Sequence, residues 1–394
     1  MPLFSNQIAD KAADQVTDRI SEADFFQHYW RKQPCLFPGA CQANLNALVN
    51  STREDHLLSL AENDLVESRL VSLDYELALG PFVLETIPEH HLLMIQGLDQ
   101  HLAEVNQLLL DEFHFLPRWR IEDVMVTIGN TGANCGAHFD HYDVFLVQVR
   151  GSKDWQLDTG GHTEQQLDHD AEIRLLQNFE CFRSHRVEPG DVLYIPPGLG
   201  HLGVACCQSV TLSVGIRNPT MPELISHLAD MLVDSTDLTS RLDDGLQSST
   251  GGITNADIQN LQTKLAETIL DPDLIAHWYG NYMTELREPE VITGENSLTT
   301  EKISSLISGQ AQIACTLPTR ITYFESENVL TVFVNGDVIN TNPAVLGWLQ
   351  PLCSHRQVTG SQIPNEHYNI DLVKKLFDNG ALEIVNRENA EKYG

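Results

Sequence analysis

The sequence predicts an α+β protein with a β-rich domain, a helical region and a small mixed module, in that order along the chain. Short apolar runs separated by turn residues continue up to residue 216. The apolar period then becomes that of helices, and strand and helix patterns return near the end. We therefore expect domains at 1–216, 217–290 and 291–394, and 394 residues with 42% apolar content suffice for more than one core.

The first region is expected to form a barrel or a sandwich. Its clearest strand patterns are Asp123–Ile128, Val144–Val147, Asp191–Ile195 and Thr211–Ile216. Many short strands in one domain favour these two architectures.

The middle region begins with a strong helix pattern. Thr220 and Glu223 are spaced as a capping box, and Pro222 lies in the first turn. One helical face collects the apolar residues Met221, Leu224, Ile225, Leu228, Met231 and Leu232. After a polar stretch, 235–254, a second helix capped by Asn255 carries the stripe Ile258, Leu261, Leu265 and Ile269, and a third is expected over Pro272–Leu286.

The last region is expected to follow a linker over 287–300. Val329–Val334 and Val338–Ile339 flank Asn335-Gly336-Asp337, which predicts a β-hairpin, and a helix is expected near Leu372–Phe377.

The charge and the cysteines exclude several classes of protein. A formal charge of −31 disfavours direct binding to nucleic acid and favours a basic partner. The eight cysteines contain no CxxC pair, so neither a zinc cluster nor a disulfide framework is indicated, and we expect reduced thiols and a cytoplasmic location. We expect no signal peptide in residues 1–20 and no membrane-spanning segment.

The candidate metal ligands begin with His138-Phe139-Asp140. Residues two apart on a strand project from the same face, so His138 and Asp140 could occupy adjacent corners of one coordination sphere. Two other histidine-x-acid pairs occur, at His141 and His162, and parity places His141 on the opposite face.

A third ligand is expected at His201, 61 residues after Asp140. It follows the segment PGDVLYIPPGLG, in which a turn precedes a strand and Pro-Pro-Gly ends it, so His201 begins the next element. Two imidazoles and one carboxylate leave metal positions open, which suits a non-haem Fe(II) oxygenase better than a closed zinc site.

These motifs resemble those of the JmjC-type 2-oxoglutarate oxygenases, and specifically of the bacterial ribosomal oxygenases. The resemblance covers the HxD…H frame, PGDxxYIPPGxxH and the segments FFQHYWRKQPCLF (25–37), VESRLV (66–71), WRIEDVMVT (119–127), HFDHYDVFLVQ (138–148) and SVGIR (213–217). It implies a double-stranded β-helix of the cupin/JmjC type, a helical dimerisation region and a C-terminal winged-helix-like domain. The C-terminal third is similar in layout more than in motif.

The same resemblance implies the cofactor residues. His138, Asp140 and His201 would bind Fe(II), and Lys153 would pair with the distal carboxylate of 2-oxoglutarate, with Thr127 hydrogen-bonded to the same group. Lys153 departs from the arginine of close relatives, although a lysine serves this role in related enzymes. Arg150 is the alternative cation.

The substrate residues are expected beside the cosubstrate. Asp123, Met125 and Thr127 share one strand parity, and a guanidinium needs an acceptor and an apolar slot, which Asp123, Met125 and Tyr142 could supply. Ser213 resembles the family's other substrate contact.

The sequence therefore predicts an Fe(II)- and 2-oxoglutarate-dependent dioxygenase that hydroxylates an arginine in a basic protein of the large ribosomal subunit and forms a homodimer. One alternative is a small-molecule cupin metalloenzyme that does not use 2-oxoglutarate; the other is a binding or scaffold protein with a vestigial pocket. Decarboxylation of 2-oxoglutarate by the purified protein would separate them.

Overall fold

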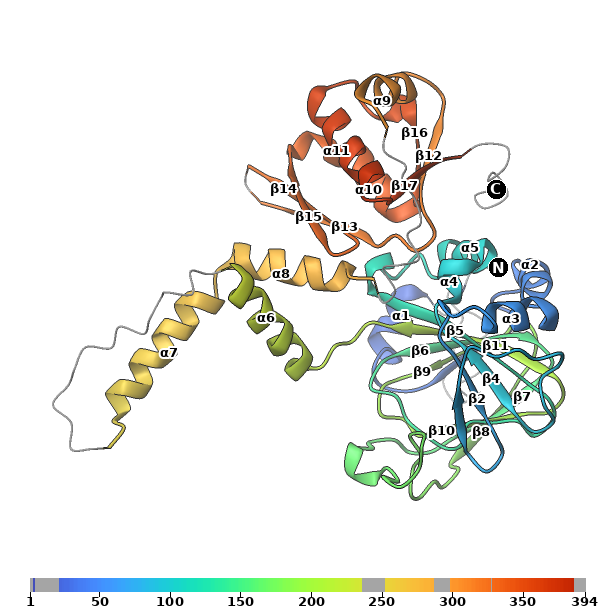
Figure 1. The fold of residues 1–394 in the computed structure, drawn as a ribbon. Helices are drawn as coiled ribbons and strands as arrows, with labels where there is room; N and C mark the ends of the chain where they lie inside the picture. The colour runs from blue at the N-terminus through green and yellow to red at the C-terminus, as the bar shows by residue number, and fades with distance from the viewer. Residues whose placement is uncertain (1–2, 4–20, 236–251, 287–297, 327, 386–394) are drawn as a thin grey trace.

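A computed structural model describes residue 3 and the ranges 21–235, 252–286, 298–326 and 328–385 (Figure 1). Residues 1–2, 4–20, 236–251, 287–297, 327 and 386–394 lie outside this description, and they include most of the predicted polar stretch and most of the predicted linker. No helix in the described ranges combines the length and the apolar character needed to cross a membrane.

The first region is a double-stranded β-helix built from two sheets that face each other. The larger sheet has the strand order β1-β9-β6-β11-β5-β4-β2-β3, and the smaller sheet has the order β10-β7-β8. The strands of the larger sheet are β1 (Cys35–Phe37), β2 (Ser68–Val71), β3 (Leu77–Leu79), β4 (Leu92–Ile95), β5 (Ile121–Gly129), β6 (Val144–Arg150), β9 (Val192–Ile195) and β11 (Ser209–Ile216). Those of the smaller sheet are β7 (Lys153–Leu157), β8 (Arg183–Val187) and β10 (His201–Ala205).

Strand β6 explains why the sequence pattern here is a continuous apolar run. Val144 and Leu146 face the interior between the sheets, where they pack with Trp155 and Leu157. Phe145 and Val147 point to the other side and join the core beneath the helices. A strand buried on both faces shows no polar alternation.

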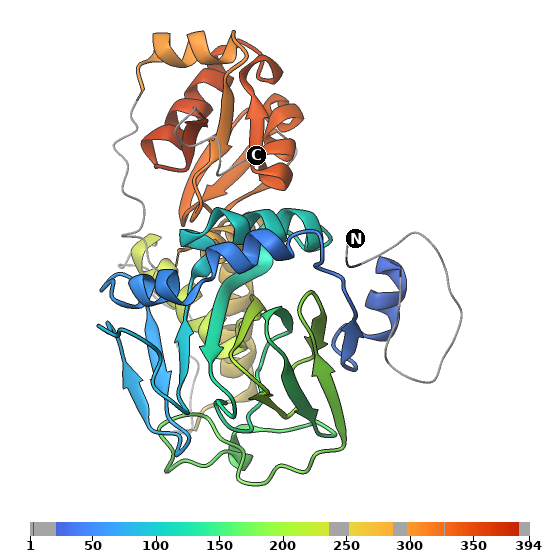
Figure 2. The same ribbon diagram turned by 90° about the vertical axis from the view of Figure 1, so that its right-hand side faces the viewer.

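Helices cover the outer face of the larger sheet, and the sequence did not predict them. They are α1 (Glu22–His28), α2 (Leu45–Ser51), α3 (Glu54–Ala61), α4 (Leu98–His101) and α5 (Ala103–Glu112). The expectation of strand patterns throughout 21–216 was therefore incomplete, because short amphipathic helices of four to ten residues give little periodicity to read. Figure 2 shows that α4 and α5 lie between the strands of the first region and the C-terminal domain.

The middle region contains α6 (Met221–Ser235), α7 (Asn255–Ile269) and α8 (Pro272–Thr284). The predicted capping box is present: the Glu223 amide donates to Thr220 Oγ1 at 3.3 Å, and the Thr220 amide donates to Glu223 Oε2 at 2.7 Å. The predicted cap at Asn255 was wrong by one residue, because Thr254 caps α7 and forms a box with Asp257. In Figure 1, α7 extends away from the two domains, whereas α6 packs against α8.

The C-terminal domain has the expected winged-helix-like layout, with two three-stranded sheets ordered β16-β12-β17 and β13-β14-β15. Its elements are α9 (Thr300–Ile307), β12 (Gln312–Cys315), β13 (Ile321–Glu325), β14 (Leu330–Val334), β15 (Asp337–Thr341), α10 (Leu346–His355), β16 (Gln357–Thr359), α11 (His367–Asp378) and β17 (Leu382–Val385). The predicted hairpin is β14–β15, and Asn335 and Gly336 have φ values of 51° and 85°, which match the right-handed strand twist of a two-residue turn. The predicted boundaries at 216 and 290 remain predictions.

Candidate metal and substrate site

The three predicted metal ligands lie together at one end of the barrel interior. One ligand atom from each of His138, Asp140 and His201 lies within 4.8 Å of the others. Among the described residues this is the one group of three or more histidine, cysteine or carboxylate side chains with such spacing.

Backbone pairing brings the two histidines together, although the expected strand geometry was wrong. His138 lies in an isolated bridge opposite His201, and β6 begins only at Val144. The His138 amide donates to the His201 carbonyl at 3.0 Å, and the His201 amide donates back at 2.8 Å. His201 begins β10, as predicted.

The imidazoles are oriented so that the donor set fits a metal ion. Nδ1 of His138 lies 2.9 Å from the Gly136 carbonyl, and Nδ1 of His201 lies 2.9 Å from the Leu199 carbonyl. A carbonyl only accepts, so each Nδ1 carries a proton and each Nε2 is directed to the shared centre. Nε2 of His201 lies 3.6 Å from Asp140 Oδ2.

The two histidines of this cluster differ in protonation. Burial and the charge of His138 lower the pKa of His201 to about 4, so His201 is neutral at neutral pH. Burial opposes a charge on His138 as well, but Cys135 and Asp140 raise the pKa of His138 to about 10. A metal ion bound at Nε2 would displace that proton, which makes metal affinity dependent on pH.

A buried carboxylate next to the backbone of Gly200, the residue before His201, was not predicted. Asp158 is buried and accepts hydrogen bonds from the Gly160 amide at 2.7 Å, from the Gly200 amide at 2.9 Å and from His162. A Cβ at Gly200 would collide with Asp158, which explains the glycine before His201. Asp158 could be predicted here only from the register of β7 and β10. That register places Leu157 opposite His201 and therefore Asp158 beside Gly200.

Lys153 is a buried cation in the same cavity. Its side chain is 3% exposed, and Nζ donates to Thr127 Oγ1 at 3.2 Å and lies 5.3 Å from the centre of the Trp155 ring. Among the described residues no carboxylate lies within ion-pair distance of Nζ. Burial lowers the pKa of Lys153 to about 8. A buried ammonium of this kind is suited to an incoming carboxylate.

The alternative cation and the second histidine lie elsewhere. Arg150 Nη2 donates to the carbonyls of Val49 and Thr52, at 2.9 and 3.4 Å, on the outer side of the sheet. His141 is exposed, and its Nε2 lies 2.5 Å from Glu164 Oε1.

All four predicted substrate residues line this cavity of about 550 Å³, together with the metal triad, Lys153 and Thr127. Asp123, Met125 and Thr127 are on β5, and Ser213 on β11 faces Met125 across the ladder. Asp123 is 8% exposed, whereas Tyr142 is 42% exposed. Tyr142 reaches the cavity from the bend before β6.

Residues to which the sequence analysis assigned no role in the site also line the cavity. They include Glu122 on β5, Arg217 after β11, Glu223 on α6 and Tyr282 on α8. The last two come from helices outside the β-helix, so only the packing of α6 and α8 brings them to the cavity.

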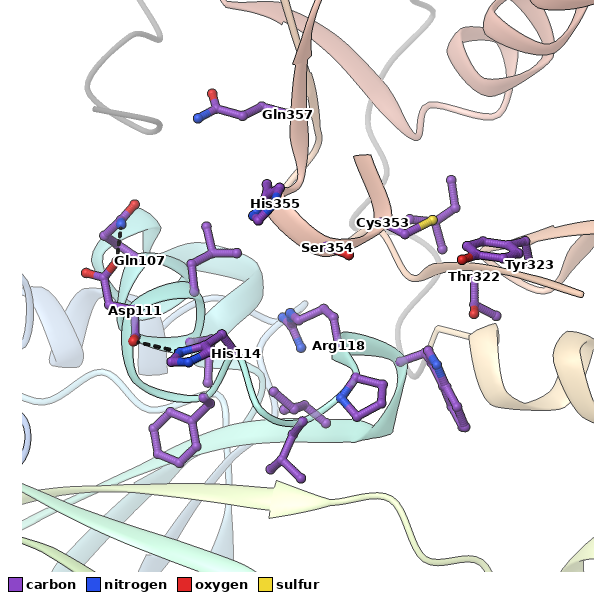
Figure 3. A pocket seen from close by; sticks show the side chains of 18 residues that line it. Gln107, Asp111, His114, Arg118, Thr322, Tyr323, Cys353, Ser354, His355 and Gln357 are labelled. Carbon is purple, nitrogen blue, oxygen red and sulfur yellow. Dashed lines mark hydrogen bonds between the residues drawn. The ribbon is translucent and has the colours of Figure 1, made fainter. Parts of the chain in front are cut away.

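A larger cavity, about 780 Å³, lies between α5 and the C-terminal domain (Figure 3). Its lining includes His114, Arg118, Cys353 and His355, but none of the metal triad. The chemistry therefore identifies the smaller cavity as the candidate site.

Comparison with known proteins agrees with this architecture. The JmjC domain family matches residues 108–224, and the ROXA-like winged helix family matches residues 260–383. The ribosomal protein uL16 3-hydroxylase of Escherichia coli is 29% identical over 271 residues, covering 67% of this chain and 71% of that protein. A probable ribosomal oxygenase of Haemophilus influenzae is 26% identical over 342 residues, covering 82% and 83% of the two chains.

Solved structures share the fold. The X-ray structure of E. coli ycfD superimposes with a TM-score of 0.79 and 24% identity, covering 93% of this chain and 98% of that one. The structure of YcfD in complex with cobalt and 2-oxoglutarate has a TM-score of 0.78 at the same identity, covering 93% and 99%.

Proposed function

We propose that this chain, which carries a JmjC domain and a ROXA-like winged helix and is homologous to ribosomal oxygenases, hydroxylates an arginine side chain of the large-subunit ribosomal protein uL16. The reaction would use Fe(II), 2-oxoglutarate and dioxygen. The observation that carries the proposal is the buried Lys153 ammonium, which shares one cavity with the His138, Asp140 and His201 cluster.

The residues of the cavity divide into three roles. His138, Asp140 and His201 would hold Fe(II), which together with 2-oxoglutarate and dioxygen would supply the oxidant that inserts an oxygen atom into a C–H bond. Lys153 would bind the distal carboxylate of 2-oxoglutarate, and Thr127 would donate to the same group. Trp155 and Leu146 line the apolar side, which keeps water from the reacting centre.

The substrate side offers a slot for a guanidinium and its stem. Asp123 would accept charge-assisted hydrogen bonds from the guanidinium, and Ser213 would add a polar contact. Met125 and Tyr142 would enclose the alkyl stem. Gln96 Nε2 donates to Met125 Sδ at 3.4 Å, which supports the position of the thioether.

The direct test is mass spectrometry of uL16 after incubation with the purified protein, Fe(II) and 2-oxoglutarate. We expect one arginine to gain the mass of one oxygen atom, and no gain with the Asp140→Ala variant. Decarboxylation of 2-oxoglutarate without modification of any ribosomal protein would refute the substrate. Absence of decarboxylation would favour the small-molecule cupin or scaffold alternatives.

The buried Lys153 predicts how cosubstrate affinity depends on pH. The 2-oxoglutarate carboxylate requires the protonated amine, whose pKa is about 8. We therefore expect the apparent KM for 2-oxoglutarate to be nearly constant below pH 8 and to rise about tenfold per pH unit well above it. Measuring this KM from pH 6.5 to 9.5 tests the expectation.

The Lys153→Arg variant is the matched control, because arginine stays protonated throughout this range. Its profile should be flat, whereas Lys153→Ala should raise the KM about 10- to 100-fold at pH 7, corresponding to about 1.5–3 kcal/mol for a charge-assisted contact. A steep profile in Lys153→Arg would assign the titration to another group.

The exposed apolar stripes of α6 and α7 support the proposed homodimer. Met221 and Ile225 are 65% and 59% exposed, and Ile258 and Leu265 are 45% and 49% exposed. We expect light scattering to give twice the chain mass for the wild type and a single chain mass for Ile225→Glu combined with Leu265→Glu. Val83→Glu, which alters an apolar residue 83% exposed on the catalytic domain, should remain dimeric. A monomeric wild type would refute the proposal.

A further inference from the structure

The strand that carries Asp123 lacks a regular ladder where the substrate is expected. Strand β5 pairs with β4 only from Val126 to Gly129. On its other side, the register with β11 shifts between Gly215 and Ile216, so Asp123 faces Gly215 and Ile121 faces Ile216 while Glu122 has no opposite residue. Such bulges aim a side chain at a functional site, but they weaken the pairing that would hold it.

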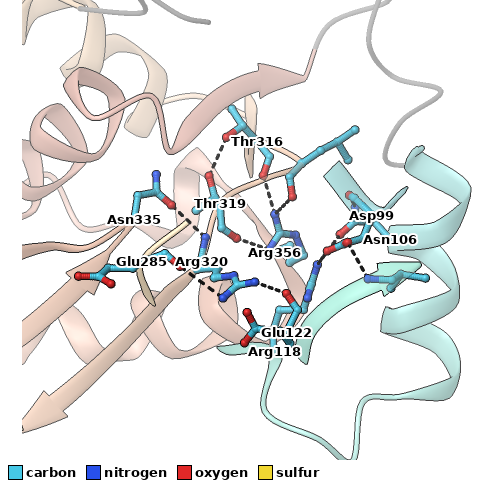
Figure 4. Close-up of polar contacts among 12 residues, drawn as sticks. Asp99, Asn106, Arg118, Glu122, Glu285, Thr316, Thr319, Arg320, Asn335 and Arg356 are labelled. Atoms are coloured by element: carbon cyan, nitrogen blue, oxygen red, sulfur yellow. Dashed lines mark hydrogen bonds and ion pairs between the residues drawn. The ribbon is translucent and has the colours of Figure 1, made fainter. Parts of the chain in front are cut away.

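Side chains from outside the sheet replace the missing pairing around Asp123. The Val124 amide donates to Asp99 Oδ1 of α4 at 3.1 Å. Arg320 Nη2 of the winged-helix domain donates to the Glu122 carbonyl (Figure 4). Both residues adjacent to Asp123 are therefore anchored, one from the catalytic domain and one from the C-terminal domain.

A second arginine contacts the same two residues as Arg320 and shares one acceptor with it. Arg217 Nε lies 3.2 Å from Glu122 Oε2, and Arg217 Nη1 donates to the Glu285 carbonyl at 3.3 Å. Arg320 Nη1 donates to the same Glu285 carbonyl at 3.3 Å. The two guanidinium groups thus join the bulge of β5 to the end of α8. We call Arg217, Arg320, Glu122 and Glu285 the arginine clamp.

The surroundings fix the arginine clamp in place. Arg320 is 6% exposed, and its amide donates to Asn335 Oδ1 at 3.0 Å. Glu285 Oε1 lies 2.8 Å from His227 Nε2, which joins α6 to the same cluster. The Arg217 guanidinium lies 4.7 Å from the centre of the Tyr282 ring, and Tyr282 forms part of the cavity wall.

We propose that Arg320 is a positioning residue through which the winged-helix domain holds the bulged start of β5, and with it Asp123, in the geometry that binds the protein substrate. The inference rests on the proposed function of Asp123. It assigns the C-terminal domain a role in substrate affinity that requires no contact between that domain and the substrate.

The test compares Arg320→Lys with Arg356→Lys. A lysine at position 320 keeps the charge and the stem, but as a point donor it cannot reach both carbonyls as the guanidinium does. Arg356 is equally buried, at 4% exposed, and donates to the carbonyls of Thr316, Leu317 and Thr319 inside the winged-helix domain. Arg356→Lys therefore controls for a general loosening of this domain.

We expect Arg320→Lys to raise the KM for uL16 about tenfold, with little change in kcat and no change in 2-oxoglutarate decarboxylation without substrate. Hydrogen exchange should accelerate in residues 121–126 and stay unchanged around His138 and His201. Arg356→Lys should leave both the KM and the exchange of residues 121–126 as in the wild type.

An unchanged KM in Arg320→Lys, or an equal rise in Arg356→Lys, would overturn the inference. If the wild type fails to modify uL16, the proposed function is refuted, and hydrogen exchange in the two variants still decides whether Arg320 holds the strand.

Discussion

Replacing Asp140 or His201 by alanine is expected to reduce 2-oxoglutarate turnover to below about one-thousandth of the wild-type rate, equivalent to about 4 kcal/mol of activation free energy. Each variant leaves two of the three proposed metal ligands, and an open site with two protein ligands retains metal poorly. Carbon dioxide release in the presence of added Fe(II) measures the loss.

The fold should survive these substitutions, because the triad lies in the cavity and not in the main core. The Asp140 side chain is 22% exposed, and the backbone bonds between His138 and His201 do not involve their imidazoles. Circular dichroism and the melting temperature should stay close to those of the wild type. His141→Ala is the matched control and should keep full turnover. Full activity in Asp140→Ala with metal still bound would refute the proposed ligand set.

Asp123→Ala should lower kcat/KM for uL16 by about 30- to 1,000-fold, which corresponds to about 2–4 kcal/mol for loss of a buried charged acceptor. Decarboxylation of 2-oxoglutarate without the protein substrate should continue, because Asp123 is separate from the metal triad and from Lys153. Mass spectrometry of uL16 alongside carbon dioxide release distinguishes the two activities.

Two further variants sharpen this experiment. Asp123→Asn keeps the shape and removes the charge, so its loss should lie between those of the wild type and Asp123→Ala. Glu172→Gln changes another carboxylate that lines the same cavity, and its effect should be less than about threefold. Normal modification of uL16 by Asp123→Ala would show that the guanidinium slot has been assigned to the wrong residues.

The sequence predicted those elements whose patterns are local. The strands around β5, β6, β9 and β11, the capping box at Thr220 and the Asn335-Gly336 turn are each specified by adjacent residues. The HxD pair and the PPG segment before His201 likewise predicted which three side chains lie together.

What the sequence could not predict depends on register and on contacts between distant segments. Asp158 meets Gly200 only because β7 and β10 pair with Leu157 opposite His201. The contact between Arg320 and Glu122 joins residues 198 positions apart. His138 and Asp140 were expected on a regular strand, but an isolated bridge and a bend position them instead.

The proposed metal ligands His138 and His201 lie at the two ends of a long loop. Their reciprocal backbone bridge decides whether the chain entropy of closing that loop is lost during folding or during metal binding. Closing a loop of this length costs several kcal/mol of chain entropy, and that cost grows only slowly with length. Two backbone hydrogen bonds close the loop, and neither of them uses an imidazole nitrogen. An ion at the proposed site would therefore not be needed to hold the two histidine segments together, and we expect it to be exchangeable without unfolding of the protein.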